Sequence, residues 1–224
     1  LDKPIDLSST QALGAVKRLI NPKKAGHAGT LDPLATGVLP LALGDATKLV
    51  NYAQDALKTY DFTIKWGERT DTDDREGEII ATSDHIPSAE DITAALPHFS
   101  GEIEQIPPKY SAIKIDGQRA YDLARAGHDV EIKSRIVYIK SLNMTSHAGL
   151  ISNFTCLCGK GTYIRALARD IAQNLGTEGH IIELRRTQVG PFTTENAVSL
   201  DVLENLSHKD DLEDILQPLE TVLD

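Results

Sequence analysis

A single carboxylate in an apolar stretch is the residue of this sequence best suited to chemistry. The stretch GHAGTLDPLATGVLPLALG, residues 26–44, places Asp32 directly before a proline, and the nearest lysine or arginine is Lys24. Aspartate before proline commonly forms a turn or caps a helix. A carboxylate shielded from water can instead act as a nucleophile or a base. The composition of the stretch leaves both interpretations open.

A carboxylate with such a role needs a nearby cation to stay ionised. An arginine about 4 Å away contributes on the order of 4 kcal/mol at an effective dielectric of ~20, which is enough to oppose a rise in pKa caused by burial. The candidates are Arg165, Arg169, Arg185 and Arg186. Only Arg165 stands at the start of a strongly amphipathic helix beside an aromatic residue, which distinguishes it from the other three.

Two tyrosines, a histidine and a lysine are further candidates. Tyr60 lies in KTYDFTIKW and Tyr163 in GTYIR, and either could be an ordinary half-exposed tyrosine. The two could instead stack on a planar base, a contact worth ~1–3 kcal/mol per base. His27 and Lys3 could equally be a loop histidine and a surface lysine. Residue type alone does not decide between these interpretations.

The sequence disfavours a metal site and a phosphate loop. No two of the seven histidines lie within four residues of each other. Cys156 and Cys158, two positions apart, indicate reduced thiols in a cytosolic protein. The acidic run 71–74 lacks the later glycine and glutamate of a calcium loop, and GKG at 159–161 has no Walker pattern around it.

Hydrophobic periodicity and turn signals predict the elements that must position these residues. The clearest is a helix at 161–176, whose apolar residues recur at helical spacing and which ends at Gly176. Serine caps predict two more helices, and alternating apolar residues predict strands. We expect helices from Ser8 and Ser9 onward and at 87–99, one or two short acidic helices within 199–217, strands at 58–66, 130–147, 150–158 and 181–192, and an extended segment, a turn at 116–117 and a short helix within 105–127.

These elements predict an α+β fold. Helices and strands alternate without a regular βαβ rhythm, which favours a mixed, largely antiparallel sheet. The 224 residues, 41% of them hydrophobic, suit one sizeable domain with a small appendage.

The net charge of −10 is unevenly distributed along the chain. Residues 201–224 hold eight carboxylates and one lysine, so this segment carries most of the negative charge. The rest of the chain is close to balanced and could still present a basic face to a nucleic acid.

The motifs together resemble those of the bacterial tRNA pseudouridine-55 synthases, the TruB-type family. The apolar stretch continues as GHAGTLDPLATGVLPLALGDATKL, and six further blocks follow the family's order: DKP at 2–4, KTY at 58–60, GERTDTDD at 67–74, IPPKYSAIKIDGQRAYDLARAG at 106–127, GKGTYIRALARDI at 159–171 and LRRTQVG at 184–190. The resemblance covers nearly the whole chain. It implies the catalytic fold of pseudouridine synthases, a curved sheet flanked by helices.

The resemblance also implies an activity and roles for individual residues. Such enzymes isomerise uridine 55 in the T-loop of tRNA to pseudouridine by flipping the base out, without metal, cofactor or guide RNA. We expect a cytoplasmic protein and, because nothing in the sequence demands a larger assembly, a monomer. By this resemblance Asp32 is the catalytic aspartate and Arg165 its partner. Tyr60 stacks on the target base and takes part in proton transfer. The substrate-binding positions implied are His27, Tyr60, Tyr163, Leu184, Asp74 and Lys3.

The family comparison also implies a domain layout and reveals one departure. Residues 1–200 would form the catalytic domain, with an RNA-gripping insertion at about 106–130. Residues 201–224 would lead to a C-terminal PUA-type RNA-binding domain that is absent from this chain, which suggests a fragment. Asp6 stands where the family usually has glycine, and this puts the local turn in doubt.

Two other functional classes remain open at this stage. A nucleoside hydrolase would need a second carboxylate near Asp32, and the cluster at 71–74 is the sequence's candidate. A tRNA-folding chaperone would open the loop without chemistry. Free uracil among the products would support the first class, and refolding of tRNA by an Asp32 variant would reveal the second activity.

Overall fold

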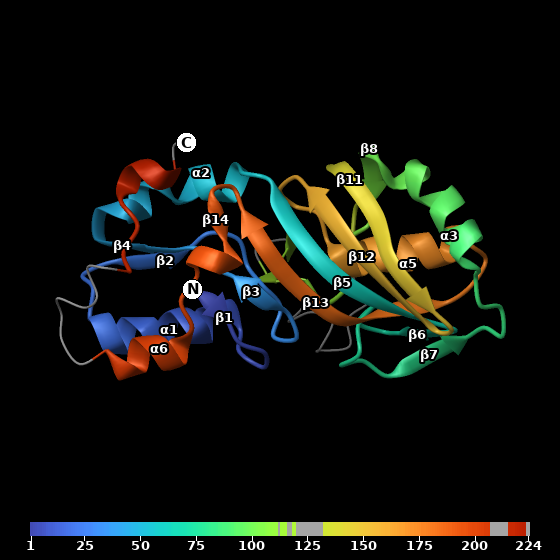
Figure 1. Ribbon diagram of the computed structural model, residues 1–224, viewed down its shortest axis with the longest axis horizontal. Helices are drawn as coiled ribbons and strands as arrows, with labels where there is room; N and C mark the ends of the chain where they lie inside the picture. Colours follow the sequence, from blue (N-terminus) through green and yellow to red (C-terminus); the bar gives the residue numbers. More distant parts are fainter. Residues whose placement is uncertain (112, 116–117, 120–131, 207–214, 223–224) are drawn as a thin grey trace. The chain divides into compact units, whose positions relative to one another are not determined.

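The computed structural model describes residues 1–224 except 112, 116–117, 120–131, 207–214 and 223–224 (Figure 1). The chain forms two compact units, one made of residues 1–61 and 184–224 and the other of residues 62–183. Strands β5 (Lys58–Trp66) and β13 (Gly179–Val189) have residues in both. Among the described helices, none is both long and apolar enough to span a bilayer.

The first unit combines short strands, paired both parallel and antiparallel, with short helices. β3 pairs antiparallel with β1 and parallel with β13, and β14 pairs antiparallel with β13. β2 and β4 form a separate antiparallel pair. The elements are β1 (Asp2–Lys3), α1 (Ser9–Ile20), β2 (Ala25–His27), β3 (Thr36–Val38), β4 (Leu41–Leu43), η1 (Gly44–Leu49), α2 (Val50–Asp55), β14 (Phe192–Thr193), η3 (Thr194–Asn196), α6 (Leu200–Asn205) and η4 (Leu219–Val222).

Local chemistry explains where α1 begins and ends. Ser8 accepts from the backbone of Gln11 while the Gln11 side chain accepts from the backbone of Ser8, which is a capping box. Lys17 and Arg18 lie in the last turn, where the helix dipole favours cations. Asn21 ends the helix in the left-handed conformation, at φ 52.

The parallel pairing of β3 with β13 requires a glycine at position 37. Gly37 has φ +102, and a Cβ there would lie 2.1 Å from the carbonyl oxygen of Arg186. Gly37→Ala is expected to lower the free energy of unfolding by about 3 kcal/mol or more, because a β-carbon cannot fit without moving the neighbouring strand. Urea denaturation measures the loss.

Gly44→Ala provides the matched control for Gly37→Ala. Gly44 also has a positive φ, +60, but a Cβ there meets no atom within 4 Å. This variant is expected to lose only about 1 kcal/mol, from backbone strain. Equal losses in the two variants would contradict the steric argument.

The second unit is built on a long antiparallel sheet and one amphipathic helix. β8, β11 and β12 are successive antiparallel neighbours, and β5 follows β12 in the strand order (Figure 1). The elements are β6 (Glu68–Thr70), β7 (Ile79–Thr82), α3 (Ala89–Ala95), η2 (Leu96–Phe99), β8 (Gly101–Gln105), β9 (Lys114–Ile115), β10 (Gln118–Arg119), β11 (Arg135–Ala148), β12 (Ile151–Cys158) and α5 (Ile164–Asn174).

Helix α5 packs its apolar face into the core of this unit. Ile164, Leu167, Ala168, Ile171 and Ala172 are all buried, as their spacing predicts. A Cβ on Gly179 would lie within 3.2 Å of side-chain atoms of Ala172, Ile64 and Trp66, so helix and strands meet closely there.

Trp66, the single tryptophan of the chain, lies in the same core. Its side chain is 1% exposed, and its Nε1 donates to the hydroxyl of Ser152 at 2.7 Å. Its ring meets Phe154 edge-on, and Phe154 stacks on Phe62 with centroids 5.2 Å apart. The indole is therefore fully packed and its polar atom is satisfied.

The structure confirms the α+β class and most of the expected elements. β5 matches its predicted bounds, β11 and β12 match two further strands, and Ser88 caps α3 as its serine predicts. Cys156 and Cys158 are both buried, and neither takes part in a disulfide. The expected turn at 116–117 and the helix after it lie outside the described residues, as does most of the 106–130 insertion. Of the acidic segment 199–217, α6 is described and 207–214 is not.

Candidate functional site

Asp32 lies in the first unit, in the turn between β2 and β3. Its carbonyl accepts a hydrogen bond from the backbone N–H of Ala35 at 3.1 Å. The residue itself is partly exposed, whereas Leu31, Leu34 and Val38 around it are at most 3% exposed. Asp32 is thus a partly exposed residue in a stretch whose apolar residues are buried.

Both neighbours of Asp32 are held by residues near the N-terminus. Ser9 accepts from the backbone N–H of Leu31 at 2.8 Å and donates to its carbonyl at 3.1 Å. Lys3 is fully buried, and its ammonium donates to the carbonyls of Pro4, Leu7 and Pro33. In the structure Lys3 therefore holds the turn after Asp32, and its Nζ faces backbone oxygens.

The turn at Asp6 forms even though the family usually has glycine at this position. The φ of Asp6 is 66, the left-handed region that glycine adopts most easily and aspartate tolerates. Its backbone N–H donates to the carbonyl of Pro33 at 2.9 Å. The turn is therefore made with an aspartate, and it contributes a second contact to the peptide that follows Asp32.

Arg186, in β13, holds the same loop. Its side chain is 1% exposed, with Nε donating to the carbonyl of Val38 at 2.8 Å and Nη2 to that of Gly29 at 3.0 Å. Nη1 lies 3.5 Å from the hydroxyl of Tyr60. One buried guanidinium therefore spans the loop that carries Asp32 and reaches the tyrosine predicted to stack on the substrate.

His27 lies at the end of β2 in the same unit. Its Nδ1 is buried and has no hydrogen-bond partner among the described residues. Burial, and then the positive charge of Arg186, lower the pKa of His27 below its usual range. The imidazole is therefore neutral at neutral pH, and its buried nitrogen is an unmet polar atom.

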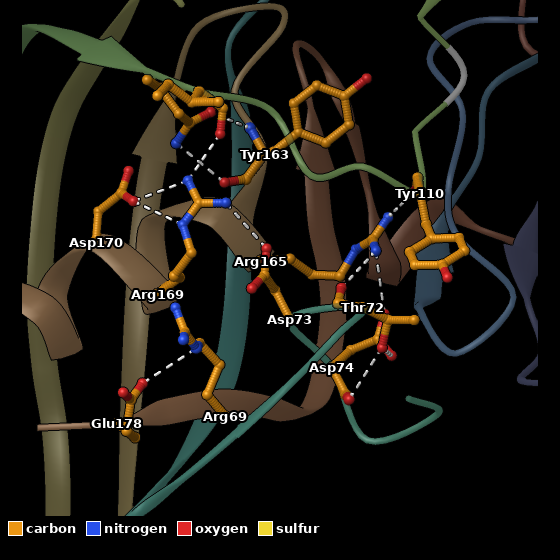
Figure 2. Close-up of polar contacts among 12 residues, drawn as sticks. Arg69, Thr72, Asp73, Asp74, Tyr110, Tyr163, Arg165, Arg169, Asp170 and Glu178 are labelled. Carbon is orange, nitrogen blue, oxygen red and sulfur yellow. Dashed lines mark hydrogen bonds and ion pairs between the residues drawn. The ribbon is translucent and has the colours of Figure 1, made fainter. Parts of the chain in front are cut away.

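Arg165 lies in the second unit, in the first turn of α5 (Figure 2). Nη1 lies 3.2 Å from Oδ2 of Asp74 and donates to the carbonyl of Thr72 at 2.8 Å. Nη2 donates to the carbonyl of Tyr110 at 3.0 Å. Both side chains of the ion pair are 4% exposed. The structure thus brings together Arg165 and Asp74, which the sequence treated as separate candidates.

Asp74 is oriented by its own loop as well. Its Oδ1 accepts from the hydroxyl of Thr72 at 2.7 Å and from the backbone N–H of Glu76 at 3.0 Å. The residue is 3% exposed. A carboxylate with this many donors is fixed in direction, so its second oxygen is aimed at Arg165.

Tyr163 occupies the position just before α5, and Gln105 fixes the backbone around it. The backbone N–H of Tyr163 donates to Oε1 of Gln105 at 2.8 Å, and Nε2 of Gln105 donates to the Tyr163 carbonyl at 3.1 Å. The guanidinium of Arg135 lies 4.8 Å from the centre of the tyrosine ring. One face of the ring is thus already occupied by a cation.

The predicted site residues divide between the two compact units. His27, Asp32, Tyr60, Lys3 and Leu184 belong to the first, and Asp74, Tyr163 and Arg165 to the second. The pairing of Asp32 with Arg165 stays a prediction. Within the described part of the chain, no three histidine, cysteine or acidic side chains are grouped to hold a metal ion.

Comparison with known protein families covers residues 17–224 of the chain. Residues 17–164 match the N-terminal domain of the TruB family pseudouridylate synthases, and residues 165–224 match the C-terminal domain of tRNA pseudouridylate synthase B. The chain belongs to the TruB family. The boundary between the two matches, at residue 164, falls at the start of α5, inside the second compact unit.

Individual TruB relatives are similar over the whole chain. It is 56% identical to the tRNA pseudouridine synthase B of Caulobacter sp. (strain K31), over all of this chain and 73% of that protein. It is 50% identical to the protein of that name from Rhodospirillum rubrum, again over all of this chain and 73% of the relative. The family assignment therefore rests on both halves of the chain.

Solved structures of lower identity share the fold. The chain is 28% identical to a chain in the crystal structure of a Cbf5-Nop10-Gar1 complex, with a TM-score of 0.76 over 99% of this chain and 59% of that chain. A structure of an H/ACA RNP bound to a substrate RNA containing 2′-deoxyuridine gives 27% identity and a TM-score of 0.68, over 99% of this chain and 56% of that chain. This TruB chain thus spans somewhat over half the length of those structural neighbours.

Proposed function

We propose that this chain is the catalytic part of a tRNA pseudouridine synthase that converts uridine 55 of the T-loop to pseudouridine. The observation that carries the proposal is the 56% identity, over all of this chain, to a protein named tRNA pseudouridine synthase B. Two observations support it, each within its own unit: the turn of Asp32 is anchored by Ser9, and Arg165 forms a buried ion pair with Asp74.

The reaction is an isomerisation, so atoms balance without a second substrate. The bond between N1 of uracil and C1′ of the ribose breaks, the base turns, and C5 bonds to C1′. C5 loses its proton and N1 gains one. Asp32 acts at the sugar, either as the nucleophile at C1′ or as the base that removes a ribose proton.

The remaining site residues handle the flipped base. Extruding a uracil from a folded loop costs a few kcal/mol, which stacking on Tyr60 offsets. Leu184 and Tyr163 line the uracil pocket, and His27 contacts the RNA near the displaced nucleotide. Arg165 keeps the carboxylate of Asp32 charged, and the apolar residues around Asp32 limit its hydration.

The enzyme acts on the T-arm of tRNA as a cytoplasmic monomer and without a guide RNA. The sequence LDPLATG at 31–37 is typical of the bacterial branch of the family, whose members act without a guide RNA. Residues 1–200 serve as the catalytic domain with the insertion at 106–130, and 201–224 lead toward a PUA-type domain.

Carbodiimide mapping of a tRNA transcript tests this function. Treatment with the protein, in EDTA and without ATP or guide RNA, is expected to create one new reverse-transcription stop that marks position 55. A transcript with cytidine at 55 is the matched control and should give none. No stop with a full-length substrate, or release of free uracil, would contradict the proposal, the latter in favour of a nucleoside hydrolase.

A further inference from the structure

Two arginines one turn apart on α5 hold the same two segments of the second unit (Figure 2). Arg165 contacts the loop at 72–74 and the carbonyl of Tyr110. Arg169, four residues later, lies 3.0 Å from Oδ2 of Asp73 through Nη1 and donates from Nη2 to the carbonyl of Ile106 at 2.7 Å. Residues four apart share a helix face, so the two guanidiniums form one double clamp.

The backbone conformation of Asp73 sets the direction in which the chain enters Asp74. The φ of Asp73 is 60, in the left-handed region that residues other than glycine rarely adopt. Its carbonyl accepts from the backbone N–H of Ile181 at 3.1 Å, and Asp74 forms a parallel bridge with Ile181. Because Asp73 sets the direction of the chain entering Asp74, a contact that holds Asp73 also aims the Asp74 carboxylate.

We propose that Asp73 and Arg169 are positioning residues. Their ion pair holds the 72–74 loop and the segment at 106–110 in place, and this keeps the carboxylate of Asp74 paired with the guanidinium of Arg165 during the reaction. The proposal rests on the proposed function. Neither residue needs to touch the substrate. Both act through Asp74 and Arg165, and their loss should lower the rate of reaction more than the affinity for tRNA.

The charges around Asp73 make its ionisation adjustable. Burial raises the pKa of Asp73 to about 6, with Asp170 adding to the rise and with Arg169 and Arg165 opposing it. Asp170, which bonds to Nε of Arg169 at 2.9 Å, also has a raised pKa, chiefly because it is buried. Asp73 is therefore ionised above about pH 6, and the ion pair with Arg169 weakens below it.

Because the pKa of Asp73 is raised, its effect on the reaction rate can be distinguished from its effect on the stability of the fold. When the pKa of a carboxyl group is higher in the folded state than in the unfolded state, the group favours folding at a pH below its unfolded-state pKa. That contribution is lost as the pH rises through its folded-state pKa. Ionised Asp73 is therefore a cost to the fold at pH 7.5. Asparagine removes the charge and tolerates the left-handed conformation. Asp73→Asn should thus keep or raise the melting temperature while lowering the rate.

Single-turnover kinetics on the T-arm substrate test the proposal. Asp73→Asn and Arg169→Gln are each expected to slow pseudouridine formation by about 10- to 100-fold at pH 7.5, with tRNA affinity within about twofold. The double variant should be no slower than the slower single variant, because both remove one contact. Arg69→Gln is the matched control, since Arg69 pairs with Glu178 at 3.3 Å and is not one of the two clamping arginines, and it should keep the wild-type rate.

The pH profile provides the second readout. The ratio of wild-type rate to Asp73→Asn rate is expected to shrink as pH falls from 7.5 to 5, because the wild-type protein loses the same charge by protonation. A wild-type rate in Asp73→Asn, or a ratio that does not change with pH, overturns the proposal. A wild-type protein that forms no pseudouridine overturns the proposed function instead, so the two failures are distinguishable.

Discussion

Replacing Asp32 with asparagine is expected to lower pseudouridine formation by at least about 10³-fold. The amide keeps the size of the side chain and the turn around it. It can neither attack C1′ nor accept a proton from the sugar, so both candidate mechanisms fail. Affinity for tRNA should stay within about threefold, as measured by filter binding beside single-turnover assays.

Asp45→Asn is the matched control for this experiment. Asp45 lies in the same unit, and its side chain is 83% exposed and paired with the exposed Lys48. A surface pair of this kind contributes little, so rate and stability should both stay at wild-type values. Turnover by Asp32→Ala at the wild-type rate would remove Asp32 from the chemistry.

Arg165→Met is expected to have the second-largest effect, on both stability and rate. The substitution leaves the carboxylate of Asp74 buried without this partner, and breaking a buried pair in this way costs about 3–5 kcal/mol. It also frees the carbonyls of Thr72 and Tyr110 from the guanidinium. We expect the rate to fall by about 10²-fold or more, since the loop and the 106–110 segment lose their shared anchor.

Further variants separate the causes of this loss. Arg165→Lys keeps a positive charge but cannot reach three oxygens with a planar fork, so it should recover part of the stability and little of the rate. Adding Asp74→Asn to Arg165→Met removes the orphaned charge and should restore part of the unfolding free energy. A free energy for Arg165→Met within about 1 kcal/mol of wild type would contradict the buried-pair argument.

The elements with strong local signals could be predicted from the sequence. Ser8 and Gln11 make the capping box that starts α1, and alternation fixes β5 at 58–66. The segment 26–44 gave no such signal, because β2, β3 and β4 are three residues each and rich in glycine and alanine. Their positions depend on partners far along the chain, such as β13, which local periodicity does not report.

The site could be predicted only in part, because several of its contacts also join residues that are distant in the sequence. Asp32 stands out by its apolar surroundings, and the family resemblance supplied the roles of the others. Ser9 and Arg186 were missed as anchors because each acts on backbone groups of residues distant in sequence, which no motif records. The pair of Arg165 and Asp74 was missed because the carboxylates at 71–74 resemble a solvated turn until the fold buries two of them.

The buried indole of Trp66 gives the protein an intrinsic optical probe. Because it is the chain's one tryptophan and lies within 62–183, its emission reports the environment of that unit alone. Circular dichroism averages over every helix and strand. Superimposed denaturation curves from the two signals would mean that both units melt as one cooperative block, and separated curves would give each unit its own midpoint.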